Sequence, residues 1–514
     1  MPMSCNGINN KNINNGSTNS RDPLPPAAPP VSPSGKFPLS STQQVVWLDQ
    51  YLRPDSTCYN LGSVVLIEGE LDEALLIRAF KTVVYRHDAL RLRLVNTQEL
   101  PLQELTTPDN VSVAIRDFSG HADAEEQAKQ SIHAVFTCPF DLNGELWRFE
   151  LLRVSDHRWY WQFCCHHLIG DAITLGLIAE DIANIYRCLI RGEEITQAAP
   201  SYLDFIDEDH AYLNSQRYQQ DKQFWLERYK NLPPELIQPA NTAEKADNKH
   251  PEPLVWQWDQ AFFQRIEDTV AVQGLSVLHF MYAVLACYFS RTTYFSRSDF
   301  SQVGFSQVNS SEEIVMGIPV HNRKNAKQKR TIGMFSSVIP VGITVSPDDT
   351  FLDVMNKTAA ELRRCYKRQR LPIAEINRLI KTQQKSGRTQ LFDIMLSFEW
   401  IAVNADIPNA TLNYSKIQRG APFPLIIAVH QYAFANSEDT HKPVTFEFDF
   451  SPDYLSRAEV ITLQSRLSVL IEAALASPEM PIRNLPMLPE SEQQRLAAFN
   501  ATRMDFPPDG SVNS

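Results

Sequence analysis

The chain has 514 residues, 43% of them apolar, which exceeds what one hydrophobic core usually serves, so two sizeable lobes are expected. With 60 acidic against 48 basic side chains, its formal net charge of −12 argues against nucleic acid or an anionic membrane as a partner. Its eight cysteines form no Cys-x-x-Cys pair, and no apolar run has membrane length. The sequence therefore predicts a cytoplasmic protein with reduced thiols, no structural zinc and no transmembrane segment.

Three stretches stand out by their polar composition. Residues 1–36 hold seven Asn, seven Pro and no aromatic side chain, which predicts a disordered leader. Residues 240–253 are polar and charged and are predicted to form a hinge loop. Residues 290–313 are rich in Ser and Phe and are predicted to be a local insertion of unknown purpose.

Apolar periodicity and β-propensity predict the regular elements between these stretches. In chain order they are a capped helix start at Ser40, a strand at 63–68, a helix at 71–84, a strand at 158–165, helices at 173–190 and 277–289, a strand at 444–450 and a helix at 456–475. The strand at 158–165 is aromatic and apolar at nearly every position, so it should be buried on both faces.

The junction between that strand and its helix carries the strongest chemical signal. His166 and His167 end the strand, and Asp171 follows four residues after His167. Because successive residues of an extended chain point to opposite sides, the two imidazoles should have different roles, one facing a cavity and one packed inward. A neutral imidazole can accept a proton from an attacking amine, alcohol or thiol. The alternative is a hydrogen-bonded pair of core histidines with Asp171 as a helix cap.

Residues 166–172 resemble the H-H-x-x-x-D-G signature of condensation domains from nonribosomal peptide synthetases, with Ala172 in place of the final Gly. These domains belong to the chloramphenicol-acetyltransferase-like acyltransferases. Further segments resemble the family's motifs in the family's order, at residues 40–47, 86–94, 202–205, 317–323, 332–338 and 391–398. The resemblance covers roughly residues 37–514, nearly all of the chain that is expected to fold.

The resemblance implies an α/β fold of two chloramphenicol-acetyltransferase-like lobes, arranged as a V-shaped pseudo-dimer with a central tunnel. Residues 37–235 would form the first lobe and 236–488 the second, and 489–514 would begin a linker to an adenylation domain. The implied reaction is acyl transfer, in which the amine of an aminoacyl thioester attacks a donor acyl thioester. No metal or bound cofactor is implied, because coenzyme A and phosphopantetheine carry the substrates.

The resemblance also assigns roles to single residues. His167 would accept or position the amine proton beside His166, and Asp171 would support the turn through a salt bridge to Arg323. Gly170 and nearby backbone N–H groups would stabilise the oxyanion. Ser337 replaces a family Asn, and apolar side chains at Val338, Met395 and Leu396 are available to line a substrate site. At Ala172 we expect a negative φ, since Ala disfavours the left-handed region.

A run of basic residues follows the motif at 317–323, namely Arg323, Lys324, Lys327, Lys329 and Arg330. Such a run is usually a solvated loop. The alternative is a contact for the phosphate of phosphopantetheine or for an acidic carrier protein.

The donor is inferred from the resemblance together with the position of the first motif, within about forty residues of Met1. A domain placed so would receive its donor from a separate molecule, which favours a starter condensation domain that uses acyl-coenzyme A. A peptidyl carrier and an adenylation domain are the expected downstream partners. The alternatives are an elongation domain fed by a separate carrier, an epimerisation domain, a freestanding acyltransferase and a catalytically degenerate interaction module.

Overall fold

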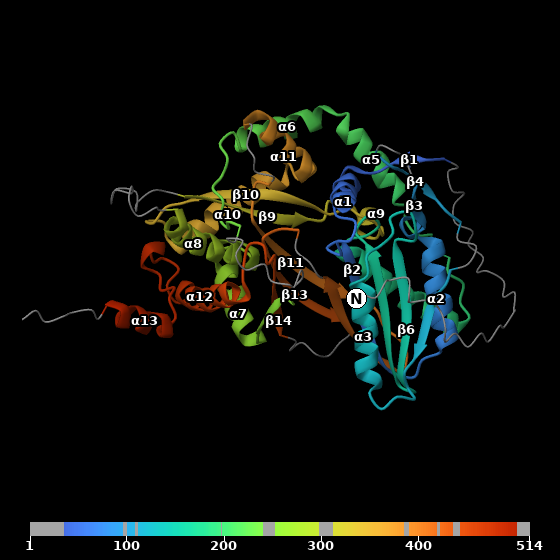
Figure 1. The fold of residues 1–514 in the computed structure, drawn as a ribbon. Coiled ribbons are helices and arrows are strands. Elements are labelled where there is room, and N and C mark those ends of the chain that lie inside the picture. Colours follow the sequence, from blue (N-terminus) through green and yellow to red (C-terminus); the bar gives the residue numbers. More distant parts are fainter. Residues whose placement is uncertain are drawn as a thin grey trace, which may run out of the picture.

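The computed structural model describes residues 35–95, 100–107, 111–196, 198–239, 252–297, 312–384, 390–418, 422–434 and 443–500. Nearly all of the predicted leader and hinge, much of the predicted insertion and the end of the predicted linker lie outside these residues. The described part forms two large β-sheets, of five and six strands, and one small three-stranded sheet, with helices packed on the large sheets (Figure 1). The chain therefore has the expected α/β fold.

The first lobe is built on a five-stranded sheet in the order β12-β2-β7-β6-β5. Every neighbouring pair is antiparallel except β5 with β6. The strands are β2 (Asn60–Gly69), β5 (Ala114–Asp117), β6 (Trp147–Ser155), β7 (Arg158–His166) and β12 (Ala410–Gln418). Helices α2 (Glu73–Arg86) and α4 (Ala172–Arg191) pack together, while α3 (Ala124–Phe136) contacts β2, β6 and β7.

Strand β7 is buried on both faces, as its sequence predicts. Trp161, Phe163 and Cys165 belong to the core that α2 and α4 share. Tyr160 and Cys164 point the other way, into a smaller cluster with α3. Because successive side chains of a strand point to opposite faces, those of β7 alternate between the helices on one side of the sheet and α3 on the other. The strand that ends at the paired histidines is held from both sides.

Smaller elements complete the first lobe. A three-stranded sheet has the order β1-β4-β3. Its strands are β1 (Phe37–Pro38), β3 (Leu92–Val95) and β4 (Leu102–Leu105). Helix α1 (Ser41–Leu52) begins at a capping box formed by Ser40 and Gln43, which confirms the predicted capped start. A short 3₁₀ helix, η2 (Asp88–Arg91), leads into β3.

The second lobe is built on a six-stranded sheet in the order β10-β9-β11-β13-β14-β8. Strand β11 runs parallel to β9 and β13, and the other pairs are antiparallel. Its strands are β8 (Leu254–Trp258), β9 (Glu312–Val320), β10 (Ser337–Val345), β11 (Ile394–Val403), β13 (Leu425–Phe434) and β14 (Val444–Phe450).

Helices α7, α10 and α12 of the second lobe pack against α8, whose residues from Phe280 to Ala286 are almost inaccessible to solvent. The helices of this half of the chain are α7 (Gln260–Val272), α8 (Val277–Arg297), α9 (Ala326–Lys329), α10 (Phe351–Tyr366), α11 (Ile373–Gln384), α12 (Arg457–Ala476) and α13 (Glu490–Asn500), with the 3₁₀ helix η4 (Ile482–Asn484). Within the described residues, a membrane-spanning length of apolar helix occurs only when the sharply bent pair α7 and α8 is taken together.

Two helices and two crossing segments join the lobes. Helices α5 (Leu203–Leu213) and α6 (Gln216–Arg228) arch over one side of the molecule (Figure 1). In the opposite direction, strand β12 leaves the second half of the chain and pairs with β2 along nine residues. Ile332, Met334 and Phe335 also lie in the core of the first lobe. The predicted boundary at residue 235 assigns β12 and the segment at 332–335 to the second lobe. In the structure both segments complete the first lobe.

Candidate functional site

Strand β7 delivers His166 into a fully buried setting. The side chain is 1% exposed, and burial lowers its pKa to about 3, with the positive charges of His167 and Arg148 acting in the same direction. Nδ1 accepts a hydrogen bond from the backbone N–H of Leu168 at 3.2 Å. Nε2 therefore carries the hydrogen in the neutral ring and donates to Oε1 of Gln50 at 3.1 Å. Both ring nitrogens of His166 are thus occupied within the protein.

His167 has a different environment, as the alternation of an extended chain predicts. Its side chain is partly exposed, and its Nδ1 lies 3.0 Å from the carbonyl oxygen of Gly170. Because a carbonyl can only accept, Nδ1 carries the hydrogen and Nε2 keeps its lone pair. Burial lowers the pKa of His167 to about 4, so the ring is neutral near pH 7. None of the described residues hydrogen-bonds to Nε2, which leaves a proton acceptor at this position.

The turn that presents His167 is fixed by its neighbours. Gly170 is packed so tightly that an added Cβ would lie 2.9 Å from Cγ2 of Thr174 and 3.2 Å from Sγ of Cys165. Gln43, in the first turn of α1, donates from Nε2 to the carbonyl oxygen of Leu168 at 2.9 Å. The motif at residues 40–47 therefore supports the histidine turn directly. The residues around Gln43 in the sequence do not reveal this role.

Asp171 and Arg323 form the salt bridge that the resemblance implies. Nη1 of Arg323 lies 2.6 Å from Oδ2 of Asp171 and Nη2 lies 2.9 Å from Oδ1, and both side chains are 0% exposed. Asp171 also caps helix α4 by accepting the backbone N–H of Thr174 at 3.1 Å. Burial would raise the pKa of Asp171, but the Arg323 guanidinium and these hydrogen bonds lower it below its ordinary value. The carboxylate is therefore ionised and saturated with donors.

A segment from the second half of the chain closes over this ion pair. The backbone N–H of Phe335 and the hydroxyl of Ser336 donate to Oδ2 of Asp171 at 3.2 and 3.0 Å. Gly333 has φ +155°, a conformation that favours glycine, and an added Cβ there would overlap the ring of Tyr202. Ser336 thus supplies a contact to the aspartate from the second half of the chain.

Ala172 is the first residue of α4, so it has helical backbone angles. Among the described residues other than glycine, only Asn322 and Asn409 have positive φ, which confirms the expected negative φ at Ala172. The departure from the family's Gly therefore requires no strained backbone. Helix α4 starts immediately after the Asp171 cap, and the turn keeps its hydrogen bonds.

A second buried ion pair acts on His167, and no sequence motif points to it. Nζ of Lys416 lies 2.7 and 2.6 Å from the two carboxylate oxygens of Glu399, and the side chains are 9% and 14% exposed. Besides burial, the charge of Lys416 lowers the pKa of His167, whereas Glu399 raises it. Glu399 is on β11 and Lys416 on β12, so only the folded chain brings both within electrostatic reach of the imidazole.

The predicted substrate-lining residues lie at the start of two elements of the second lobe. Ser337 and Val338 begin β10 and are partly exposed. Met395 near the start of β11 is also partly exposed, whereas Leu396 is fully buried in the core of the second lobe. Leu396 therefore packs inward and is corrected from a candidate lining residue to a core residue, because adjacent strand residues face opposite sides.

The comparison with known families shows the family to which the chain belongs. A family model described as the condensation domain matches residues 34–497. The chain belongs to the condensation domain family. Condensation domains of nonribosomal peptide synthetases form amide bonds by acyl transfer, so the paired histidines and the Asp171–Arg323 bridge stand in an acyltransferase fold. In the part of the chain that the structure describes, no group of His, Cys, Asp or Glu could hold a metal ion.

Curated relatives of this condensation domain are much longer chains. Tyrocidine synthase 3 of Brevibacillus parabrevis is 25% identical over 94% of this chain, which corresponds to 7% of the synthase. Gramicidin S synthase 2 of Aneurinibacillus migulanus is 24% identical over 93% of this chain and 10% of its own length. The chain thus spans a small part of the synthases that it matches.

Solved structures share the fold of this condensation domain. The starter condensation domain of rhizomide synthetase RzmA, solved as a mutant in complex with C8-CoA, superposes with a TM-score of 0.73 at 24% identity. That match covers 88% of this chain and 98% of the other. The first condensation domain of the calcium-dependent antibiotic synthetase has a TM-score of 0.73 at 21% identity, over 89% of this chain and all of the other.

Proposed function

We propose that this condensation domain N-acylates an aminoacyl thioester with acyl-coenzyme A as the donor, as a starter domain does. The amine nitrogen attacks the donor carbonyl carbon to give a tetrahedral oxyanion, which collapses with cleavage of the carbon–sulfur bond. The amine proton passes to Nε2 of His167 and from there to the departing coenzyme A thiolate. The products are an N-acylaminoacyl thioester and free coenzyme A.

The observation that carries this proposal is the state of His167. Its Nδ1–H is fixed by Gly170, its pKa is lowered to about 4, and its Nε2 is the ring atom left to accept a proton. Most of the acceleration would come from holding the two thioesters in the right orientation, with proton transfer adding to it. A ring that is already neutral needs no deprotonation before it acts.

The remaining predicted residues have supporting roles in this proposal. His166 positions the turn, because both of its ring nitrogens are occupied. Asp171 and Arg323 hold the start of α4 in place. The backbone N–H of Gly170 is assigned to the oxyanion, and Ser337, Val338 and Met395 are assigned to the walls around the substrates. Acyl-coenzyme A is chosen as donor because the RzmA starter domain, which shares this fold, was solved with C8-CoA.

The test is a choice between two donors. The domain is incubated with an aminoacyl-loaded carrier protein and with either octanoyl-coenzyme A or an octanoyl-loaded carrier. The carrier-bound product is then identified by mass spectrometry. We expect N-octanoyl product from octanoyl-coenzyme A at a rate at least about tenfold above that from the carrier, since the free donor needs no protein–protein docking.

A series of acyl-coenzyme A lengths and aminoacyl groups covers the unknown specificity. Product from the acyl carrier alone would overturn the starter assignment in favour of a domain fed by a separate carrier. No product from any donor would overturn the acyltransferase proposal itself.

A further inference from the structure

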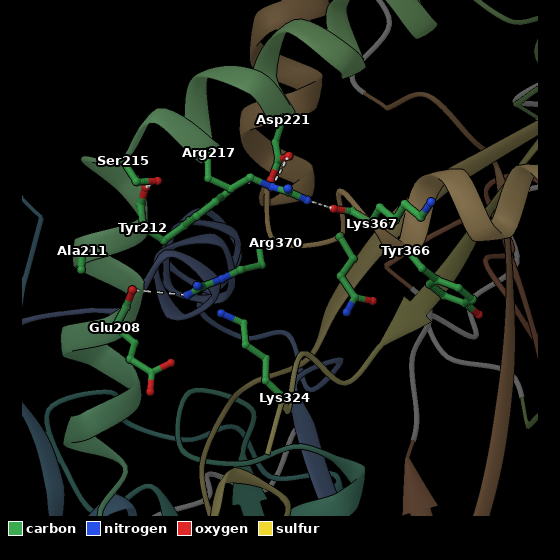
Figure 2. A pocket seen from close by; sticks show the side chains of 11 residues that line it. Glu208, Ala211, Tyr212, Ser215, Arg217, Asp221, Lys324, Tyr366, Lys367 and Arg370 are labelled. Atoms are coloured by element: carbon green, nitrogen blue, oxygen red, sulfur yellow. Dashed lines mark hydrogen bonds and ion pairs between the residues drawn. The ribbon is translucent and has the colours of Figure 1, made fainter.

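A cavity of about 530 Å³ lies outside the histidine turn, between helix α5, the start of α6 and the turn that follows α10. Figure 2 shows its lining, with the side chains of Lys324 and Arg370 directed into the space beside α5. Arg217 and Lys367 line the same cavity, together with the ring of Tyr212. The volume is within the usual range for small-molecule sites, roughly 300–1,000 Å³.

The acidic side chains of this cavity are already engaged by other groups. Asp221 is 1% exposed and lies 3.0 Å from Nε of Arg217 and 2.9 Å from Nη1 of Arg368. The hydroxyl of Tyr212 donates to Asp221 at 3.0 Å. Glu208 accepts a hydrogen bond from Nε2 of Gln328 at 2.9 Å, so its charge is also partly satisfied.

Three cations of the cavity, Lys324, Lys367 and Arg370, are less well matched, whereas Arg217 pairs with Asp221. Among the described residues, no carboxylate lies within ion-pair distance of Lys324 or Lys367. The nearest carboxylate oxygen to Arg370 is that of Asp209 at 3.9 Å. Partial burial lowers the pKa of Lys324 and the neighbouring Arg370 lowers it further, whereas the carboxylates of Glu208 and Asp209 raise it. Lys324 and Arg370 nevertheless line one cavity without a carboxylate in ion-pair contact with Lys324, and in a protein whose formal net charge is −12 this indicates a site shaped for an anion.

The guanidinium of Arg370 is held in a defined orientation. It stacks over the ring of Tyr212, with 4.5 Å between the carbon of the guanidinium and the ring centroid. It also donates to the carbonyl oxygen of Glu208 at 3.3 Å. A planar guanidinium fixed beside a flexible ammonium side chain suits the several oxygens of a phosphate, which can accept from both at once.

The wall of the cavity is continuous with the catalytic turn. Lys324 directly follows Arg323, whose guanidinium is locked onto Asp171 at the start of α4. The backbone of Lys324 is further tied by its N–H, which donates to Oε1 of Gln328 at 2.7 Å. The position of Lys324 is therefore set by the same segment that supports the site.

We propose that Lys324 and Arg370 bind the phosphate of a pantetheine-borne substrate at this cavity. The identity of the ligand rests on the proposed function, whereas anion binding by the cavity does not. The phosphate has two possible sources, coenzyme A or the arm of a carrier protein. Among the basic residues at 323–330, Lys324 alone lines this cavity.

Direct binding tests the cavity without any turnover. Affinities of pantetheine, 4′-phosphopantetheine and desulfo-coenzyme A are measured by isothermal titration calorimetry with the wild type, Lys324→Gln, Arg370→Gln and the control Lys329→Gln. Lys329 is exposed and does not line the cavity. We expect phosphopantetheine to bind the wild type and control at least about tenfold more tightly than pantetheine, and each variant to lose about tenfold of that preference.

Two results would overturn this inference. One is equal affinity of the wild type for pantetheine and phosphopantetheine, and the other is a phosphate preference that survives in both variants. Of the two side chains, only that of Arg370 stacks on Tyr212 and donates to a backbone carbonyl. Lys324→Gln is therefore expected to disturb the fold less than Arg370→Gln. Unchanged melting temperatures show that lost binding reflects lost charge.

Kinetics then identify the source of the phosphate. KM is measured for octanoyl-coenzyme A with leucyl-N-acetylcysteamine as acceptor, and for an aminoacyl carrier with octanoyl-N-acetylcysteamine as donor. If Lys324→Gln raises only the KM for octanoyl-coenzyme A, by about tenfold, the cavity binds the phosphate of the donor. If it raises only the KM for the aminoacyl carrier, the cavity binds the phosphate of the carrier-borne acceptor. A rise with two N-acetylcysteamine substrates, which lack phosphate, would contradict phosphate binding. Absence of amide product in the wild type would overturn the proposed function while the binding preference stays measurable.

Discussion

Arg323 and Lys324 are neighbours in the sequence, yet their charges have opposite surroundings. The Arg323 side chain is 0% exposed, with two hydrogen bonds to Asp171 and two longer ones to the carbonyl oxygens of Thr331 and Gly333. Lys324 faces an open cavity in which none of the described carboxylates pairs with it. The Arg323 charge is paired with Asp171 inside the protein, whereas the Lys324 charge is available to a ligand.

The same contrast separates the members of the histidine turn. Asp171 and His166 have partners at every polar side-chain atom, while His167 keeps Nε2 for a substrate. We infer that the saturated groups fix the geometry and that the open groups act. The difference predicts which substitutions cost stability and which cost activity alone.

The largest expected effect comes from His167→Ala, which removes an open group. In the proposed mechanism Nε2 of His167 accepts the amine proton. A positioned general base typically contributes about 10²–10⁴-fold in rate. We expect amide formation to fall by that factor with little change in melting temperature, because the ring donates only one hydrogen bond, to Gly170. The control is His121→Gln at an exposed position. Near-normal turnover of His167→Ala would remove His167 from the mechanism.

Asp171→Asn is expected to reduce stability as well as activity, since it removes the charge of a carboxylate whose hydrogen-bonding capacity is fully used. The change leaves the Arg323 guanidinium buried without a counter-charge, and breaking a buried pair in this way costs about 3–5 kcal/mol. Chemical denaturation should show that loss in the free energy of unfolding, accompanied by lost activity. The matched control is Asp204→Asn, whose partner Lys327 is exposed, and it should change stability by less than about 1 kcal/mol. Equal stability of the two variants would contradict the structural role of the bridge.

The two histidines predict a smaller, pH-dependent effect. Their pKa values in the folded chain are about 3 and about 4, against an ordinary 6.5. The unfolded chain therefore binds more protons than the folded one below about pH 6.5, so stability should decrease as the pH falls from 6.5 towards 4. Asp171 titrates below this window, because its pKa is lowered from 3.8.

Denaturation midpoints of the wild type and His167→Gln at several pH values measure this dependence. The variant lacks one of the two groups and should lose less stability across the window. Parallel curves for both proteins would show that His167 titrates normally in the folded state and that its ring is not held neutral.

Ala172→Gly is expected to have the smallest effect. Ala172 has helical angles, and Gly costs about 1 kcal/mol or less relative to Ala in a helix. We expect a small loss of stability and unchanged turnover, measured by thermal melting and by initial rates. A gain of about tenfold in turnover would show that Ala172 handicaps the site and would favour the degenerate interpretation.

Local patterns are enough to predict much of the fold and one long-range contact. The strand predicted at 444–450 is β14, and the helices predicted at 173–190 and 456–475 are α4 and α12 to within a residue or two. The Asp171–Arg323 bridge follows from the family resemblance and is confirmed at 2.6 Å. Periodicity succeeds here because each element buries one face through residues that are close in the sequence.

Other features depend on pairings that the sequence does not encode locally. Strand β12 joins β2 although Ala410 and its partner Gly69 are more than three hundred residues apart. Glu399 and Lys416 meet across separate strands without any motif. The basic run at 323–330 favours a solvated loop by its composition, and only the folded chain shows that Lys324 meets Arg370 while Arg323 is buried. Tertiary contacts therefore decide which charges are open.

The most direct test of the proposed mechanism follows acyl transfer in the wild type, His167→Ala and Asp171→Asn side by side. Each protein receives octanoyl-coenzyme A and an aminoacyl-loaded carrier, and the mass of the carrier-bound product is recorded over time at a temperature where all three remain folded. The mechanism predicts N-octanoyl product with the wild type, a rate lower by about 10²–10⁴-fold with His167→Ala, and normal folding of that variant. Product formation at the wild-type rate in His167→Ala, or none in the folded wild type, would contradict it.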